Sequence, residues 1–197
     1  MNEEIYERKI HQLSKETYNL ISAGEIVDRP SSALKEIIEN SLDAGATRID
    51  IEIESGGKHL LRVRDNGHGI NREDLRLALA SHATSKIRNH EDLLSVRTLG
   101  FRGEALASIS AVSRFALTSN IYEEPAEGVS IKMNQPLNNE LLVEPSPHYR
   151  GTTVEVRDLF FNTPARKKFL RTDRTEFLKL EEVIRRLALA SPSVSFS

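Results

Sequence analysis

The stretch 31-SSALKEIIENSLDAGATRIDIEIESGGKHLLRVRD-65 decides the fold that the sequence predicts. Its first third places apolar residues on one arc of a helix that turns by about 100° per residue. These residues are Leu34, Ile37, Ile38 and Leu42. Pro30 suits the first turn of such a helix, and Gly45 suits its end. We therefore expect an amphipathic helix from Ser31 to Asp43.

The remainder of this stretch predicts a β-hairpin. Isoleucines at every second position alternate with polar residues, which is typical of a strand with one buried face. They are Ile49, Ile51 and Ile53. Gly56-Gly57 marks a turn, and residues 59–65 form the returning strand.

The rest of the chain predicts an α+β fold. Helical spacing or composition is found over residues 14–27, 74–83, 104–112, 163–170 and 173–190. Strands are expected over residues 114–119, 128–133, 140–144 and 151–157, and another strand begins in 191–197. Strands in hairpins with helices grouped between them indicate a two-layer α/β sandwich. Helices would cover one face of a mixed, mainly antiparallel sheet.

Composition narrows the classes of function. The 197 residues carry a net charge of −2, which argues against coating nucleic acid by charge alone but allows a local basic patch. The absence of cysteine excludes disulfides, thiolate metal sites and thiol catalysis. The six histidines show no metal-ligand spacing. Without a long apolar run or a signal peptide, the sequence predicts a soluble, intracellular protein. The strand that only begins in 191–197 predicts that the chain was cut from a longer one.

The predicted helix at 31–43 carries an unusual polar face. Glu36, Asn40 and Asp43 lie roughly opposite its apolar arc, with Lys35 and Glu39 to the sides. Such a pattern is typical of a solvated face. It also suits chemistry, because an amide oxygen is a hard ligand for Mg²⁺ and a carboxylate one turn away can deprotonate a water. The functional interpretation places a metal-bound phosphate over this helix.

Two glycine-containing turns suggest where a ligand would lie. In 63-VRDNGHGI-70, Gly67 and Gly69 would let a flat ligand approach the backbone, and Asp65 could accept a hydrogen bond from an exocyclic amine. In 98-TLGFRGEAL-106, a glycine loop leads into a helix N-terminus, which can cradle an anion. Each pattern is also compatible with an ordinary turn.

Taken together, these motifs resemble the GHKL ATPases, the class that contains gyrase B subunits, heat-shock chaperones, sensor histidine kinases and the MutL mismatch-repair proteins. The resemblance is closest to the N-terminal ATPase domain of bacterial MutL and extends from about Leu13 to Ala190. It rests on 22-SAGEIVDRP-30, 36-EIIENSLDAGAT-47, 65-DNGHGI-70, 82-HATSKI-87, 99-LGFRGEALASIS-110, 151-GTT-153 and 161-FNTPARKKFLR-171.

The resemblance implies a Mg²⁺-dependent ATPase. Glu36 would be the general base that activates water, and Asn40 would hold Mg²⁺. Asp65 would accept a hydrogen bond from the adenine amine, and Asp43 would reach the base through water. The further residues implied to contact the nucleotide are Gly67, Gly69, Thr84, Ser85, Lys86, Gly100, Phe101, Arg102, Gly103 and Thr153. Residues 71–103 would form the ATP lid, and Thr153 would lie beside the adenine and Asp65.

The resemblance also implies a switch within a larger protein. Residues 1–20, with Tyr6, Ile10 and Leu13, would form an arm that helps to build an ATP-dependent homodimer. A second domain beyond this chain would supply a lysine to the γ-phosphate, and a C-terminal domain would dimerise. The implied partners are DNA (bound weakly and without sequence preference), a mismatch-recognition protein and a downstream endonuclease or helicase, in the bacterial cytoplasm.

Two other functions remain open. A basic cluster in 166-RKKFLR-171, with Arg174 and Arg185-Arg186, could bind nucleic-acid phosphates, although such runs are often solvated. Phosphoryl transfer to a protein is the other, because histidine kinases share the ATP-binding fold. Glu36 one turn before Asn40 favours hydrolysis, since it supplies a base for water.

Overall fold

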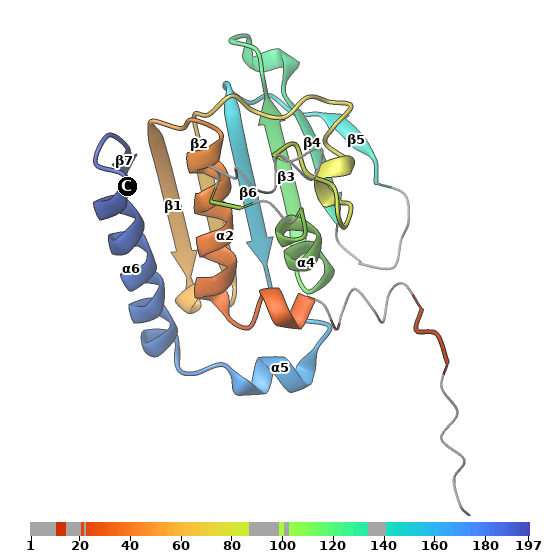
Figure 1. Cartoon of the computed structure of the whole chain (residues 1–197), viewed down its shortest axis with the longest axis vertical. Coiled ribbons are helices and arrows are strands. Elements are labelled where there is room, and N and C mark those ends of the chain that lie inside the picture. The colour runs from red at the N-terminus through yellow and green to blue at the C-terminus, as the bar shows by residue number, and fades with distance from the viewer. Residues whose placement is uncertain (1–10, 15–20, 22, 87–98, 101–102, 134–140) are drawn as a thin grey trace, which may run out of the picture.

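The computed structural model describes residues 11–14, 21, 23–86, 99–100, 103–133 and 141–197. In this part of the chain, seven strands form one sheet in the order β5-β4-β3-β6-β2-β1-β7 (Figure 1). The strands are β1 (Arg48–Glu54), β2 (Leu60–Asp65), β3 (Arg114–Asn120), β4 (Val129–Met133), β5 (Val143–Pro145), β6 (Gly151–Arg157) and β7 (Ser195–Phe196). Neighbouring strands are antiparallel except β1 and β7, which are parallel.

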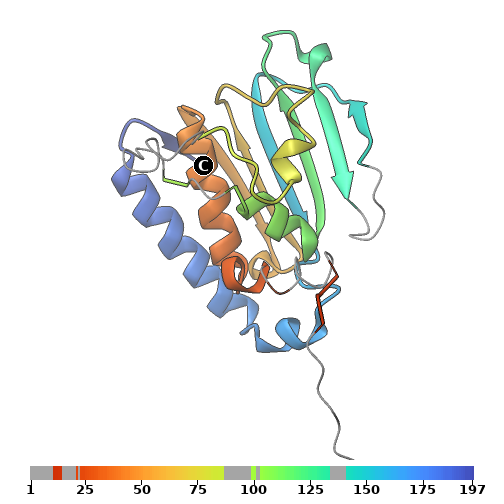
Figure 2. The ribbon, with the colours of Figure 1, turned by 45° about the vertical axis from the view of Figure 1, so that its right-hand side comes forward.

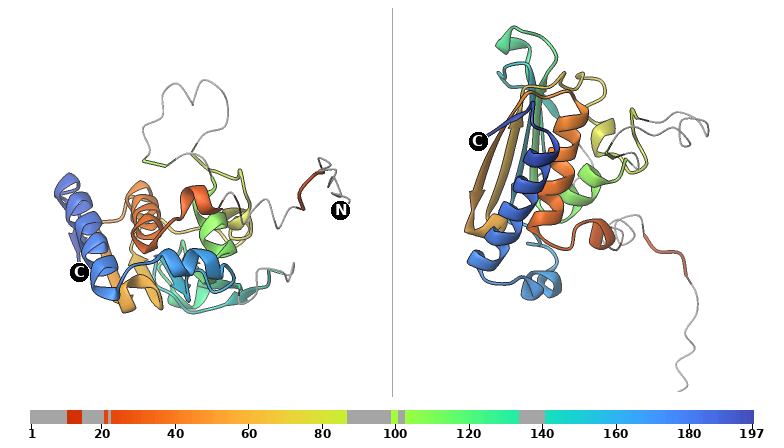
Figure 3. Two further views of the ribbon diagram at one scale, coloured as in Figure 1. Left: turned by 90° about the horizontal axis from the view of Figure 1, so that it is seen from below. Right: turned by 60° about the vertical axis from the view of Figure 1, so that its left-hand side comes forward.

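The helices confirm the predicted two-layer architecture. Figure 3 shows α2, α4 and α6 on one side of the sheet, and α2 lies next to both α4 and α6. The α-helices are α2 (Pro30–Asp43), α4 (Ala105–Ala111), α5 (Pro164–Phe169) and α6 (Asp173–Ala190). Short 3-10 turns are η1 (Ser55–Gly57), η2 (Leu77–Leu79) and η3 (Pro125–Glu127). Figure 2 shows α5 at the end of the molecule, below the sheet.

The core lies between α2 and the middle of the sheet. Leu34, Ile37 and Ile38 on α2 are at most 1% exposed, as predicted for the apolar arc. They belong to one hydrophobic cluster with Leu61 and Val63 of β2, whose side chains alternate with polar ones. The burial of this arc fixes the rotation of α2, so its polar face turns away from the sheet.

Several predicted elements differ from the structure. Residues 74–83 form only the turn η2, because Ala80 is extended and His82 has a positive φ of 64°. The predicted strand over 140–144 is a shorter β5 that starts later. On α6, Leu180 is buried, whereas Phe177 is 47% exposed. Of the predicted helix 14–27, residues 15–20 and 22 lie outside the described residues, and 23–26 are helical.

Within the described residues, no helix combines the length and the apolar character that crossing a membrane requires.

Candidate functional site

The polar face of α2 begins with Glu36, whose side chain is 29% exposed. Its carboxylate lies 3.7 Å from the Lys35 Nζ, which also donates to Glu39 Oε2 at 2.9 Å. Glu39 is buried and paired, so it belongs to the helix packing rather than to the open face. Glu36 therefore remains the acid of α2 that combines partial exposure with a place one turn before Asn40.

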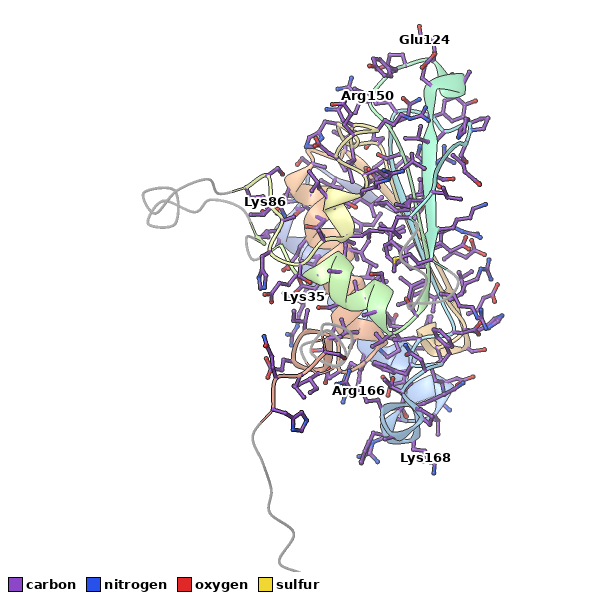
Figure 4. All side chains as sticks on the ribbon, turned by 90° about the vertical axis from the view of Figure 1, so that its right-hand side faces the viewer. Lys35, Lys86, Glu124, Arg150, Arg166 and Lys168 are labelled. Carbon is purple, nitrogen blue, oxygen red and sulfur yellow. The ribbon has the colours of Figure 1, made fainter. Side chains whose placement is uncertain are left out.

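Asn40 and Asp43 converge on Lys86. The Lys86 Nζ donates to Asn40 Oδ1 at 2.8 Å and to Asp43 Oδ2 at 2.5 Å. Figure 4 shows Lys86 on the helix side of the molecule, beside α2. The side chains of Lys86 and Asp43 are only 19% and 10% exposed, so solvent screens this ion pair less than one on an open surface. The structure thus brings together three residues with different predicted roles: Asn40 as the Mg²⁺ ligand, Asp43 as a group reaching the base through water, and Lys86 near the phosphates.

The glycine loop reaches the same carboxylate. The backbone N–H of Leu99 donates to Asp43 Oδ1 at 3.0 Å, and that of Gly100 donates to Asp43 Oδ2 at 3.3 Å. Lys86 and this loop were predicted to lie near the phosphates of a nucleotide. In the structure, their donors are directed at the acidic end of α2.

Asp65 ends β2 and is buried, with 7% of its surface exposed. Its Oδ1 accepts from the backbone N–H groups of Gly67 at 2.9 Å and Thr152 at 3.2 Å. Its Oδ2 accepts from the Ser41 hydroxyl of α2 at 2.8 Å. A carboxylate has about four acceptor positions. One position therefore remains, and it is on Oδ2.

Burial raises the pKa of the Asp65 carboxyl above its ordinary value. The hydrogen bonds from Gly67, Ser41 and Thr152 act in the opposite direction, as does His148, but they offset only part of the effect. Burial also lowers the pKa of His148, which favours its neutral form. A buried carboxylate with a raised pKa and one open acceptor position is a candidate binding group.

The two glycines after Asp65 are required first by the protein itself. A Cβ on Gly67 would lie 2.8 Å from the Cβ of Ala44, just beyond the end of α2, and 3.1 Å from Asp65 Oδ1. A Cβ on Gly69, which has a φ of +76°, would lie 2.2 Å from the backbone oxygen of Asn120. Small residues thus let the end of β2 pack against α2 and β3.

The register of the sheet corrects the placement of Thr153. Thr152, not Thr153, is paired with Asp65, while Thr153 is paired with Arg64. Because side chains alternate along a strand, Thr153 points to the opposite face, where its Oγ1 lies 2.7 Å from His148 Nε2. The prediction that Thr153 lies beside Asp65 is therefore wrong, and Thr152 holds that place.

The remaining predicted contacts lie around the start and end of the lid. Thr84 is half-buried and accepts from the Lys86 N–H through its Oγ1 at 3.2 Å, whereas Ser85 is exposed. Gly103 has a φ of +64°, and a Cβ there would lie 2.3 Å from the Ala83 oxygen. This close approach brings Gly103, at the end of the predicted lid, next to Ala83. Phe101 and Arg102 lie outside the described residues.

Sequence reasoning missed Ser41 and Thr152. The alternation of side chains along the strand could have identified Thr152. Thr152 points to the same face as Val154 and Val156, which are buried, whereas Thr153 points to the same face as Glu155. Ser41 gave no such signal, because its contact with Asp65 joins residues 24 positions apart.

The predicted basic cluster is divided by the structure. Lys167 and Lys168 are exposed on α5, and Figure 4 shows Lys168 at the end of the molecule away from Lys86. Arg166 is half-buried and lies against Gly24. Arg185 and Arg186 form ion pairs with glutamates one turn earlier on α6. Only part of the cluster is therefore presented to a phosphate backbone.

The side-chain oxygens of the site suit a hard cation as ligands. Asn40 Oδ1 and Asp43 Oδ2 already hold the ammonium group of Lys86, so they form a place where positive charge is stabilised. Mg²⁺ prefers few protein oxygens together with phosphate oxygens and water. Among the described residues, no three His, Cys, Asp or Glu side chains gather as a metal site. Asn40 therefore fits Mg²⁺ only together with a phosphate-bearing ligand.

Comparison with protein families gives one match over residues 28–147, more than half of the chain. The matching family is described as histidine kinase-, DNA gyrase B-, and HSP90-like ATPase. This match agrees with the GHKL resemblance predicted from the motifs.

Individual proteins give closer matches. The chain is 59% identical over 190 residues to a DNA mismatch repair protein MutL of Cellvibrio japonicus and 57% identical over 183 residues to one of Chromohalobacter salexigens. These alignments cover 96% and 93% of this chain but only 30% and 28% of the relatives. The chain therefore spans about a third of their length. The predicted resemblance to the N-terminal part of MutL is confirmed.

A solved structure supports the same likeness. The Aquifex aeolicus MutL ATPase domain complexed with ADP matches with a TM-score of 0.69 and 39% sequence identity. The match covers 87% of this chain and 59% of that one.

Proposed function

Because the chain belongs to the family of histidine kinase-, DNA gyrase B- and HSP90-like ATPases, we propose that it binds Mg²⁺·ATP beside α2 and hydrolyses it. It would act as the ATP-driven switch of a DNA mismatch-repair protein. One observation carries the proposal. The polar face of α2 presents Glu36 and Asn40, and the same helix is hydrogen-bonded through Ser41 to the buried carboxylate of Asp65. Groups suited to a phosphate and to a base are thus held by one element.

Asp65 recognises the base in this proposal. Its remaining acceptor position on Oδ2 takes one N–H from the exocyclic amine of adenine. A ligand that presents a carbonyl oxygen there would face an unpaired carboxylate, which costs binding free energy. Thr152, rather than Thr153, is the residue paired with Asp65 in the sheet.

Glu36 is the general base. Its partly exposed carboxylate orients a water and accepts a proton as the water attacks the terminal phosphorus in line. Asn40 holds Mg²⁺, which neutralises phosphate charge when it is bound. Most of the rate comes from positioning and electrostatic stabilisation, since phosphoryl transfer needs little covalent chemistry from the protein.

Lys86 and the glycine loop change partners in this scheme. Asn40 Oδ1, which accepts from the Lys86 ammonium, would hold the metal, and Lys86 would then pair with phosphate oxygens. The N–H groups of Leu99 and Gly100, now on Asp43, turn to the phosphates together with Gly103. Phe101, Arg102 and the rest of residues 71–103 complete the lid.

We further infer the role of the whole protein from the MutL relatives. ATP orders the lid and residues 1–20, and these segments form a dimer surface. The relatives are about three times as long as this chain, so a following domain would supply a lysine to the γ-phosphate and a more distant one would dimerise. The switch would couple a mismatch-recognition protein to a downstream endonuclease or helicase on DNA in the bacterial cytoplasm.

The decisive experiment measures Mg²⁺·ATP binding and single-turnover hydrolysis for the wild type and Glu36→Gln. We expect binding to persist and hydrolysis to fall by about a hundredfold to ten-thousandfold, the range for loss of a general base. Glu39→Gln is the matched control, because Glu39 shares Lys35 with Glu36 but is buried in the helix packing. Hydrolysis that survives Glu36→Gln would overturn the assignment. Wild-type binding without turnover would show that the second domain is needed.

The dimer switch has its own test. Sedimentation with and without a non-hydrolysable ATP analogue should show a shift from monomer to dimer for the intact N-terminal region. An unchanged molecular mass at saturating analogue would remove this part of the proposal.

DNA binding is the second candidate, favoured by Lys167, Lys168 and a Phe169 that is 83% exposed on α5. Replacing both lysines with alanine should weaken DNA binding and leave ATP hydrolysis unchanged. Equal loss of both activities would argue against a separate DNA surface.

A further inference from the structure

Ser41 occupies a position between the two parts of the candidate site. It follows Asn40 on α2, but it faces the sheet and is only 3% exposed. Its hydroxyl lies 2.8 Å from Asp65 Oδ2 and 3.2 Å from the backbone oxygen of Ile37. A serine hydroxyl has one proton to donate. The ionised carboxylate is the closer and stronger acceptor, so the proton is directed to Asp65.

The same oxygen of Asp65 carries the open acceptor position. Oδ1 is saturated by the N–H groups of Gly67 and Thr152, and among the described residues Oδ2 accepts only from Ser41. A ligand that donates to Asp65 must therefore share Oδ2 with the Ser41 hydroxyl. The direction of the hydrogen bond from Ser41 determines which lone pair of Oδ2 is left and where it points.

The backbone around Asp65 is tied to the end of α2 by other contacts. The His68 N–H donates to the Ala44 oxygen at 3.0 Å, and Gly67 packs against Ala44. Asn66 Oδ1 accepts from the backbone N–H groups of Thr47 and Arg48 at 2.9 and 2.8 Å. These contacts hold the chain, so the Ser41 hydroxyl is left to orient the carboxylate rather than to maintain the fold.

We propose that Ser41 is a positioning residue for nucleotide recognition, which orients the Asp65 carboxylate and fixes it to the helix that carries Glu36 and Asn40. The inference rests on the proposed function, because it concerns the same nucleotide site. It goes beyond that function in assigning the geometry of base recognition to a hydroxyl on the hydrolytic helix. The ligand class is a purine base with an exocyclic amine.

The proposal has a consequence for pH dependence. The groups that face Asp65 are Ser41 from α2, the N–H groups of Gly67 and Thr152, and His148 beyond the sheet. Burial raises the pKa of Asp65, and the Ser41 hydrogen bond is one of the contacts that lower it. Removing the hydroxyl raises this pKa further. Nucleotide affinity, which needs the ionised form, should then be lost at a higher pH than in the wild type.

The test measures the affinity of Mg²⁺·ADP from pH 5 to 8 by calorimetry for the wild type, Ser41→Ala and Ser41→Thr. We expect Ser41→Ala to bind about tenfold more weakly at neutral pH, as for one lost hydrogen bond to a charged group. We also expect the midpoint of its acid-side loss to move upward by about one pH unit. Ser41→Thr, which keeps the hydroxyl, should recover most of the affinity and the wild-type midpoint.

Ser113→Ala is the matched control. Ser113 is fully buried, and its hydroxyl donates at 2.7 Å to the Ile109 oxygen, the backbone acceptor four residues earlier that corresponds to Ile37 for Ser41. Its removal should leave both affinity and pH profile unchanged. Comparing variants at the same pH cancels the titration of ADP itself.

The outcomes separate the inference from the proposed function. If the wild type fails to bind Mg²⁺·ADP, the nucleotide site itself is refuted. If the wild type binds but Ser41→Ala matches Ser113→Ala in affinity and pH profile, Ser41 is structural and the inference is overturned. Weaker binding by Ser41→Ala with an unshifted midpoint would also contradict it, because a loss of packing alone changes no titration.

Discussion

Asp65 and Asp43 mark two halves of the candidate site that are built in different ways. Asp65 receives its hydrogen bonds from Ser41, Gly67 and Thr152, which belong to α2 and the two strands β2 and β6 or their ends. Asp43 receives its bonds from Lys86, Leu99 and Gly100, all of which belong to the predicted lid. Both carboxylates are nearly covered, but the first is covered by the fold and the second by groups that a nucleotide would recruit.

This difference teaches how binding and switching can be separated. The hydrogen-bond partners of the base half are held in place by the sheet register and by the packing of α2. The phosphate half is occupied by the protein's own donors. In the proposed function, a nucleotide would gain affinity in the base half and do conformational work in the phosphate half, which is the arrangement that a switch requires.

The largest expected effect comes from adding one methyl group to each half. In Gly151→Ala the new Cβ would lie 2.1 Å from the Asp65 backbone oxygen, at a φ of +122°. In Gly100→Ala the atoms of described residues that it would meet are the end of Lys86 at 3.4 Å and Asn40 Oδ1 at 4.0 Å. We expect the free energy of unfolding to fall by about 3 kcal/mol or more in the first case and by less than about 1 kcal/mol in the second.

Urea denaturation measures both changes. Gly45→Ala separates backbone strain from steric overlap, because Gly45 has a φ of +71° but nothing within 4 Å of a new Cβ. Its cost should be about 1–2 kcal/mol. Equal losses for Gly151→Ala and Gly100→Ala would show that the two halves do not differ in rigidity.

Asp65→Asn should separate binding from stability. The new amide can keep its oxygen on the Gly67 and Thr152 N–H groups and donate to the Ser41 oxygen, whose proton then turns to Ile37. The fold is preserved, but the open position now presents a donor to the adenine amine. We expect Mg²⁺·ADP to bind at least about a hundredfold more weakly, measured by calorimetry.

The stability of the same variant has a pH signature. Because burial raises the pKa of Asp65, the folded state binds its proton more tightly than the unfolded state does. The wild type should therefore lose this contribution to stability as the pH rises from the unfolded pKa through the raised folded pKa. Asp65→Asn should lack that loss, so its stability relative to the wild type should increase from pH 4 to pH 7. A decrease over this range would contradict the raised pKa.

Lys86→Met probes the phosphate half. Without the ammonium, the Asp43 carboxylate is left as an uncompensated negative charge near the phosphates when Mg²⁺ is absent. The ratio of ADP affinities with and without Mg²⁺ should therefore increase, by about tenfold or 1.4 kcal/mol. Lys58→Met is the control, because Lys58 also pairs with an aspartate, Asp173. If both variants keep the wild-type ratio, Lys86 does not compensate for the missing metal.

The smallest effect distinguishes two adjacent threonines. Thr152→Val removes a hydroxyl that lies 2.9 Å from Ser119 Oγ, which also donates to the Gly151 oxygen. Thr153→Val removes only the contact with His148 on the other face. We expect ADP affinity to fall a few-fold, for about 0.5–1 kcal/mol, in Thr152→Val and to stay constant in Thr153→Val. The reverse result would restore the original placement of Thr153.

Much of the fold could be predicted because its signals are local. The apolar arc of α2, the alternating isoleucines of β1 and the Gly56-Gly57 turn each report a period or a backbone preference. The prediction of a helix over residues 74–83 was wrong, because tertiary packing sets the backbone conformation of this segment. His82 adopts a positive φ, and η2 ends at Leu79.

The grouping of candidate site residues could be predicted where a single helix carries them. Glu36, Asn40 and Asp43 share α2, so helical geometry alone groups them. The wrong choice between Thr152 and Thr153 came from reading a motif without applying strand parity. Ser41 could not be found, because its role depends on how closely α2 approaches the end of β2, and no local pattern encodes that distance.

The most direct measurement of the difference between the halves is amide hydrogen exchange in Glu36→Gln, with and without Mg²⁺·ATP. The amides of Gly67 and Thr152, which bond Asp65, should be protected in the free protein and change little on binding. Those of Leu99 and Gly100, which bond Asp43, should change their protection by at least about tenfold. Equal responses at all four amides, or a base half that becomes protected only with nucleotide, would contradict a preformed base half beside a phosphate half that rearranges.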